Sequence, residues 1–130
     1  MRGAGRSSKR GKVTFEAVRK IALSLDNATE GTSYGTPAFF VRRALFARWR
    51  PDIDSLVARV DFERREAMMA EDPETYYITD HYLNYEWVLV RLARMAPDTM
   101  ADLLRMAWKA AGARKATMRP KRASTKRSPS

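Results

Sequence analysis

The sequence contains no cysteine and a single histidine among its 130 residues. The absence of thiols excludes disulfides, thiolate nucleophiles and cysteine-bearing zinc or iron–sulfur sites. A metal site would have to be built mainly from carboxylates, and we predict neither a metal nor a cofactor. No catalytic residue is predicted either, because no nucleophile, oxyanion or phosphate-cradling motif accompanies the one imidazole, His81.

Long apolar runs are also missing. No segment approaches the roughly 20 apolar residues that a membrane-spanning helix requires. The basic residues 1–12 are not followed by an apolar stretch of the kind that an exported protein carries. We therefore expect a soluble, cytoplasmic protein that could associate with the nucleoid.

Acidic residues are absent from both ends of the chain. Of the 25 basic residues, five lie in residues 1–12 and seven in residues 114–130, while all 15 acidic residues lie between these segments. Residues 13–113 thus hold 13 basic and 15 acidic residues, a net charge of −2, although the whole chain has a net charge of +10. Any attraction to a polyanion that the composition predicts is therefore an attraction of the two ends.

The two ends are rich in small residues, proline, lysine and arginine, and they have almost nothing to bury. Such a composition cannot offset the entropy of ordering, so we predict a disordered arm (1–12), one domain (13–113) and a disordered tail (114–130). Acid-free basic segments of this kind are typical of nucleic-acid-binding arms, and the alternatives are a solubility tail or a membrane-surface contact, for which the C-terminal tail offers only Met118 as a large apolar residue. The candidate phosphate contacts in them are Lys9, Arg10, Lys12, Arg114, Lys115, Arg119, Lys121, Arg122, Lys126 and Arg127.

Hydrophobic spacing and capping residues predict an α+β domain. Helices are expected over 15–25, capped by Thr14, over 62–71, capped by Asp61, and from Pro97 to a stop at Gly112. Strands are expected over 32–34, 38–42, 45–50, 56–61, 76–79 and 86–93. Connections this short favour antiparallel pairing. The fold class is therefore α+β, with an N-terminal helix, an antiparallel sheet of about five or six strands interrupted by a short helix, and a C-terminal helix.

Alternation along the strands predicts an arginine-bearing sheet face. The residues expected to face the core are Ala47, Trp49, Ala58, Val60, Val88, Val90 and Leu92. The intervening arginines then face outward, and a neighbouring strand adds one more; the set is Arg42, Arg48, Arg50, Arg59 and Arg91. Guanidinium groups on such a face could contact phosphates. The alternative is an ordinary solvated face whose arginines pair with Asp52, Asp54 or Asp61.

Aromatic residues provide a second candidate site. Tyr34, His81, Tyr82 and Trp87 are predicted to surround a pocket for a small ligand or a protein partner. Stacking on unpaired bases is a further use of such rings, with Trp49, Tyr76 and Tyr85 as additional candidates, although we favour a core role for the two tryptophans. For His81 we favour a structural hydrogen bond over general-base catalysis.

Three stretches resemble the MmcQ/YjbR family: Glu30 to Phe39 (EGTSYGTPAF), Asp72 to Tyr82 (DPETYYITDHY) and Trp87 to Leu92 (WVLVRL). Their order and spacing extend the resemblance over nearly the whole of the predicted domain. The resemblance implies an α+β fold of the type called a double wing, for which DNA binding has been proposed. It implies neither an established catalytic activity nor a known cofactor.

Taken together, these features predict a non-enzymatic DNA-binding protein of low sequence specificity. Basic tails and an arginine-bearing sheet face would contact the phosphates. The alternative is a small-ligand or protein-partner module that uses the pocket near Tyr34, His81 and Trp87. DNA is the expected partner, a protein partner is a second, and no membrane partner is expected.

Overall fold

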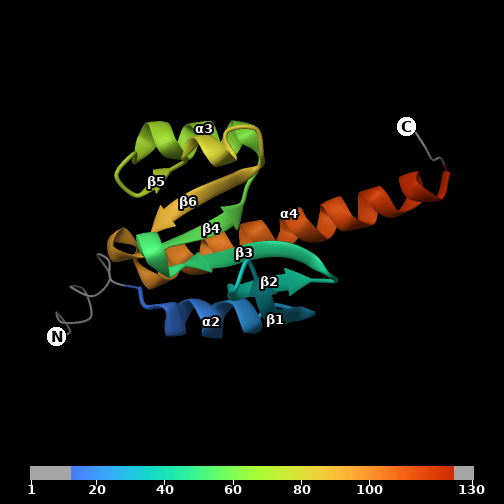
Figure 1. The fold of residues 1–130 in the computed structure, drawn as a ribbon, viewed down its shortest axis with the longest axis horizontal. Coiled ribbons are helices and arrows are strands. Elements are labelled where there is room, and N and C mark those ends of the chain that lie inside the picture. The colour runs from blue at the N-terminus through green and yellow to red at the C-terminus, as the bar shows by residue number, and fades with distance from the viewer. Residues whose placement is uncertain (1–12, 125–130) are drawn as a thin grey trace.

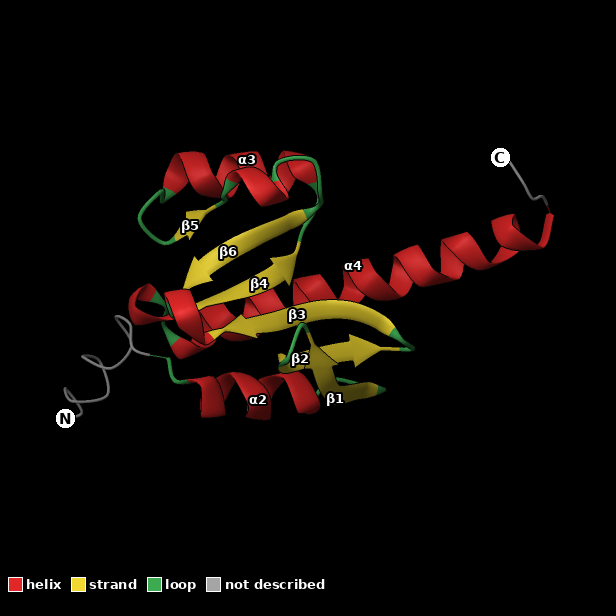
Figure 2. Cartoon of the chain, viewed as in Figure 1, coloured by secondary structure: helices red, strands yellow, loops and turns green. Residues whose placement is uncertain are grey.

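The chain folds into a six-stranded antiparallel sheet with two helices packed on one face and a third beside its far edge (Figures 1 and 2). This computed structural model describes the backbone of residues 13–124 and the side chains of residues 13–113. The strands are β1 (Ala28–Ser33), β2 (Thr36–Val41), β3 (Ala44–Arg50), β4 (Ser55–Arg59), β5 (Tyr76–Tyr77) and β6 (Trp87–Arg91). Their order across the sheet is β1-β2-β3-β4-β6-β5. The predicted fold class is confirmed.

The three α-helices of the described chain begin at the predicted positions. They are α2 (Phe15–Leu23), α3 (Phe62–Glu71) and α4 (Pro97–Ser124). The Thr14 hydroxyl accepts from the Ala17 N–H at 3.2 Å, and the Asp61 carboxylate accepts from the Arg64 N–H at 2.7 Å. Both predicted N-caps are thereby confirmed. Short 3-10 turns at Pro51–Ile53, Asp80–Tyr82 and Leu92–Arg94 complete the connections.

The main core lies between one face of the sheet and helices α2 and α4. All seven residues predicted to face inward lie in this cluster or pack against it. A bulge in the β2–β3 pairing adds to the core: Phe39 pairs with Ala47 and Phe40 with Leu45, so Phe46 is the extra residue. Phe46 and Ala47 are both fully buried, because the bulge directs two consecutive side chains inward.

The hairpin turns differ from the predicted ones. The first strand begins at Ala28, four residues early, and the turn is Tyr34-Gly35. The next turn is Arg42-Arg43. Three of these four residues, Tyr34, Arg42 and Arg43, adopt positive φ angles without being glycine or asparagine. Positive φ at both central positions fits the twist of a two-residue hairpin, but the side chains give no such signal.

The predicted stop at Gly112 is wrong, because α4 continues to Ser124. Gly112 does not adopt the positive φ of a helix-ending glycine. A glycine inside a helix costs only about 1 kcal/mol relative to alanine, and the residues around it are alanine, arginine and lysine, which favour helix. Residues 114–124 of the predicted disordered tail therefore belong to α4, which extends beyond the sheet (Figure 1). None of the helices within residues 13–124 is long and apolar enough to cross a membrane.

Candidate functional site

The strand register places four of the predicted arginines on one sheet face. Arg50 pairs with Ser55, and Ser55 pairs with Arg91 on the other side. The next row joins Arg48 to Val57, and a third joins Arg59 to Trp87. This is the face opposite α2 and α4, because the alternating residues between the arginines belong to the main core. We call it the arginine face, defined by Arg48, Arg50, Arg59 and Arg91.

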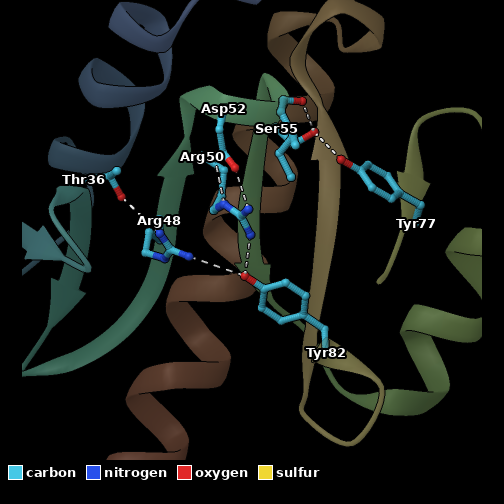
Figure 3. Close-up of polar contacts among 8 residues, drawn as sticks. Thr36, Arg48, Arg50, Asp52, Ser55, Tyr77 and Tyr82 are labelled. Carbon is cyan, nitrogen blue, oxygen red and sulfur yellow. Dashed lines mark hydrogen bonds and ion pairs between the residues drawn. The ribbon is translucent and has the colours of Figure 1, made fainter. Parts of the chain in front are cut away.

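Arg50 is partly neutralised, in agreement with the alternative interpretation. Its Nε and Nη2 donate to the two carboxylate oxygens of Asp52 at 3.1 and 2.7 Å (Figure 3). This hydrogen-bonded charge pair lowers the pKa of Asp52 and raises the pKa of Arg50. The other two candidate acids do not pair with the arginine face: Asp61 caps α3, and Asp54 forms none of the ion pairs found among the described residues.

The connection between β5 and β6 covers part of the arginine face. Its Tyr82 is buried and packs with Val57 and Leu89 in a second, smaller apolar cluster. The Tyr82 hydroxyl accepts from Arg50 Nη1 at 3.2 Å and, at the longer distance of 3.5 Å, from Arg48 Nη2 (Figure 3). This connection therefore lies against β3, beside Arg48 and Arg50.

The other two arginines lie against aromatic rings. The Arg59 guanidinium carbon is 4.4 Å from the centroid of Trp87, and its Nε donates to the Leu45 carbonyl at 3.0 Å. The Arg91 guanidinium carbon is 3.9 Å from the centroid of Tyr77. Cation–π contacts leave the guanidinium charge of both arginines in place.

A cavity of about 350 Å³ opens beside Arg48 and is lined mainly by rings. Five of its eight lining residues carry a phenol, indole or imidazole, namely Tyr34, His81, Tyr82, Tyr85 and Trp87; the others are Leu45, Arg48 and Val57. We call it the aromatic cavity. All four residues of the predicted pocket line it. Trp87 also packs against the second cluster, so its ring serves the cavity and the apolar interior together.

His81 is exposed at the rim of the aromatic cavity. Its ring lies edge-on to Tyr82, with centroids 4.8 Å apart, and 6.4 Å from the ring of Tyr85. The contacts that the described residues give its ring are those with the two tyrosines, and the structural hydrogen bond favoured for His81 stays a prediction. The imidazole contributes a ring surface to the cavity.

Arg65 holds the connection that carries the cavity wall, and sequence reasoning missed it. It is 2% exposed, and its Nη1 and Nη2 donate at 2.7–3.0 Å to four backbone carbonyls. These carbonyls belong to Tyr82, Leu83, Tyr85 and Trp87. Nothing in the local sequence distinguishes Arg65 from its exposed neighbour Arg64. Tyr85 was missed as a pocket residue for the same reason, since its position depends on this distant arginine.

Arg42 does not join the arginine face. It lies in the β2–β3 turn and lines a separate groove with Trp108 and Lys109 of α4. The turn begins one residue earlier than predicted, which removes Arg42 from the alternating strand.

Two of the aromatic candidates lie away from the cavity. Trp49 stacks on Phe15 in the main core, with centroids 5.2 Å apart, as favoured for that residue. Tyr76 also packs against the main core. The remaining candidates in residues 1–12 and at Lys126 and Arg127 lie outside the described residues, as do the side chains of Arg114, Lys115, Arg119, Lys121 and Arg122.

Metal-site geometry is absent from the described part of the chain, where no group of three or more His, Asp or Glu residues could hold an ion.

Among proteins of curated function, none is significantly similar in sequence. The crystal structure of Deinococcus radiodurans protein DR2400, with a DUF419 domain, is similar in fold: the TM-score is 0.69 at 22% identity, over 85% of this chain and 86% of that one. The YjbR family model matches residues 23–110, which include the whole sheet and both sites described above. The chain therefore belongs to the YjbR family.

Proposed function

We propose that this protein binds DNA without acting on it chemically, with little sequence specificity. The observation that carries the proposal is the arginine face: four arginines lie on the sheet surface opposite α2 and α4, which the β5–β6 connection covers only in part. Arginine suits phosphate contacts because its planar fork can donate two parallel hydrogen bonds. In the cell, such a protein would work in the cytoplasm, at the nucleoid.

The terminal segments supply most of the charge for this interaction. Residues 13–113 have a net charge of −2, whereas the two ends together carry twelve basic residues and no acid. Five of these twelve belong to the part of α4 that extends past the sheet, namely Arg114, Lys115, Arg119, Lys121 and Arg122. A basic helix that projects from the domain can follow a phosphate backbone while the arginine face contacts the same molecule.

A salt titration of DNA binding tests the proposal. If ~6 phosphates are engaged, the plot of log affinity against log salt should have a slope near −5, because each neutralised phosphate releases a counterion. Fluorescence anisotropy with labelled duplex and single-stranded DNA would measure this. Absence of binding at low salt, or a slope near zero, would contradict the proposal.

Matched variants separate the two contributions. Replacing the five basic residues of 114–124 by glutamine removes charge but retains good helix propensity, so affinity should fall and the salt slope should become shallower, with the melting temperature unchanged. Arg59→Gln and Arg91→Gln test the sheet face, each expected to weaken binding and reduce the slope by about 1. Arg105→Gln, an exposed arginine of α4 outside the arginine face, is the control.

The aromatic cavity supports the second candidate, a module for a small ligand or a protein partner. Its volume of about 350 Å³ is near the lower end of the range for ligand pockets. A thermal-shift screen of the full chain against metabolites would test this function. Reproducible stabilisation by one compound, together with salt-independent or absent DNA binding, would favour the second candidate over the first.

A further inference from the structure

We infer that the aromatic cavity takes a single unpaired nucleobase, and that Tyr34 is the ring on which the base stacks. This inference rests on the proposed function and narrows it from DNA in general to a strand with at least one base out of the duplex. Three observations support it: the composition of the cavity wall, the backbone conformation of Tyr34, and the small volume of the cavity together with the guanidinium of Arg48 in its wall.

The cavity wall is suited to a flat, aromatic ligand. Tyr34 and Tyr85 are 87% and 58% exposed, so both rings are available at the opening. Leu45 and Val57 provide apolar surface, and Trp87 offers an indole. Stacking of a base on such rings is worth about 1–3 kcal/mol per base and depends little on which base it is. The low sequence specificity of the proposed function follows from the same chemistry.

Tyr34 occupies a backbone conformation that disfavours it. Its φ is +54°, in the left-handed region, where a bulky side chain is unfavourable and asparagine or glycine is preferred. Burial of the ring does not offset this cost, because the side chain is almost fully exposed. Among the described residues, the ring contacts the guanidinium of Arg48, whose carbon is 5.0 Å from the ring centroid. Residues held in such conformations cluster at ligand-binding positions. A tyrosine at this turn costs stability and places an aromatic ring beside the cavity.

The size of the cavity selects an unpaired base. A volume of about 350 Å³ accommodates one small planar ligand and not a base pair. Bases in a duplex present only their edges, so a base must leave the stack before a protein ring can cover its face. Arg48 adds the polar contact: its described hydrogen bonds use two of its five N–H donors, which leaves donors at the cavity wall for a phosphate or a base oxygen.

The test compares single-stranded oligothymidine with duplex DNA of the same length, using the full chain and two variants. Tyr34→Asn removes the ring and keeps a residue that tolerates positive φ, and Tyr85→Ala removes the second exposed ring. Each should weaken binding to the single strand by about tenfold, which corresponds to the loss of one stacked base, and leave duplex affinity within about twofold. Leu23→Ala, at an exposed apolar residue of α2 outside the cavity, is the control.

Two further measurements distinguish a loss of the base site from a loss of folded protein and report on the cavity directly. Tyr34→Asn should raise the melting temperature, because strain is relieved, so a loss of affinity in that variant cannot be attributed to unfolding. Binding of oligothymidine should also change the fluorescence of the protein through Trp87 in the cavity, and Trp87→Phe should reduce that change.

Each other outcome has a definite meaning. If both tyrosine variants bind the single strand as tightly as the wild type while the salt dependence persists, the base site is wrong and the proposed function stands. If the wild type binds neither strand, the proposed function itself fails. If free thymidine or another small molecule stabilises the protein in a Tyr34-dependent way but oligothymidine does not bind, the cavity is a small-molecule site and the inference is overturned.

Discussion

At the scale of single residues, Asp52 lies where it reduces the charge of the arginine face. Its carboxylate holds Arg50 by two hydrogen bonds, and the pairing lowers the pKa of Asp52. Asp52→Asn should release Arg50 to bind a phosphate, tighten DNA binding by roughly three- to tenfold at low salt, and steepen the salt slope by about 1. Anisotropy titrations would measure both. Asp54→Asn is the matched control, because it removes one negative charge from the same turn but breaks no pair with an arginine among the described residues.

The sign of the pH effect follows from the same pair. Because the folded-state pKa of Asp52 is lowered, the pair stabilises the protein above the unfolded-state pKa and loses this contribution as the pH falls through the folded value. Protonation of Asp52 also releases the charge of Arg50. DNA affinity should therefore rise as the pH falls through this acidic range, and the part of the rise due to Asp52 should be missing in Asp52→Asn. An identical pH profile for that variant would contradict the assignment.

Arg65 connects stability to the shape of the cavity. Its guanidinium is buried and satisfies four carbonyls of the connection that carries Tyr82 and Tyr85. Arg65→Met keeps much of the volume but leaves these carbonyls without their donors, and should lower the free energy of unfolding by roughly 2–4 kcal/mol. Arg64→Met, at the exposed neighbouring position, should change it by less than about 1 kcal/mol. Urea titration followed by tryptophan fluorescence would compare the two, and equal losses would refute the role of Arg65.

At the scale of elements, a substitution at Gly112 tests whether α4 ends at this residue or continues through it. Its φ is not positive, and a Cβ added there would meet nothing within 4 Å. Gly112→Ala should therefore stabilise the protein by roughly 0.5–1 kcal/mol, through helix propensity and a less flexible unfolded chain. At a helix-ending position with positive φ the same change would destabilise it. Thermal unfolding monitored by circular dichroism would give the sign.

The elements that could be predicted from the sequence are those specified by neighbouring residues. Thr14 and Asp61 lie directly before the helices they cap, and the alternation from Ala47 to Arg50 defines two faces of one strand. Elements that depend on distant contacts could not be predicted. The turn at Tyr34-Gly35 requires a tyrosine at positive φ, which no local pattern indicates.

The candidate site shows the same division. Tyr34 and Trp87 were expected to share a pocket, and they do line one cavity. The cover that Tyr82 forms over the arginine face depends on packing against Val57 and Leu89, two residues at outward strand positions. These apolar residues at outward positions were a signal in the sequence that the outer face would be partly covered. The buried guanidinium of Arg65 had no local signal, because its partners lie 17 to 22 residues away.

At the scale of the whole molecule, the base site and the basic helix lie at opposite ends of β2. Tyr34 precedes β2, whereas Arg42 follows it and lines a groove with Lys109 and Gly112, where α4 leaves the sheet. Six strand residues separate these ends by about 20 Å. A bound strand long enough to reach both regions would contact them independently. Sites this far apart contribute additively to the free energy within about 0.5 kcal/mol.

Combining Tyr34→Asn with the five glutamine replacements in residues 114–124 tests this arrangement. The loss of binding free energy for a long single strand should equal the sum of the losses for the two parent variants, and the salt slope should change only with the glutamine replacements, because stacking releases no counterions. An oligonucleotide too short to span both regions should be affected by one set of changes and not by the other. If the combined variant instead loses no more affinity than one parent, the two regions bind the same part of the strand, and the path from the aromatic cavity to α4 would be refuted.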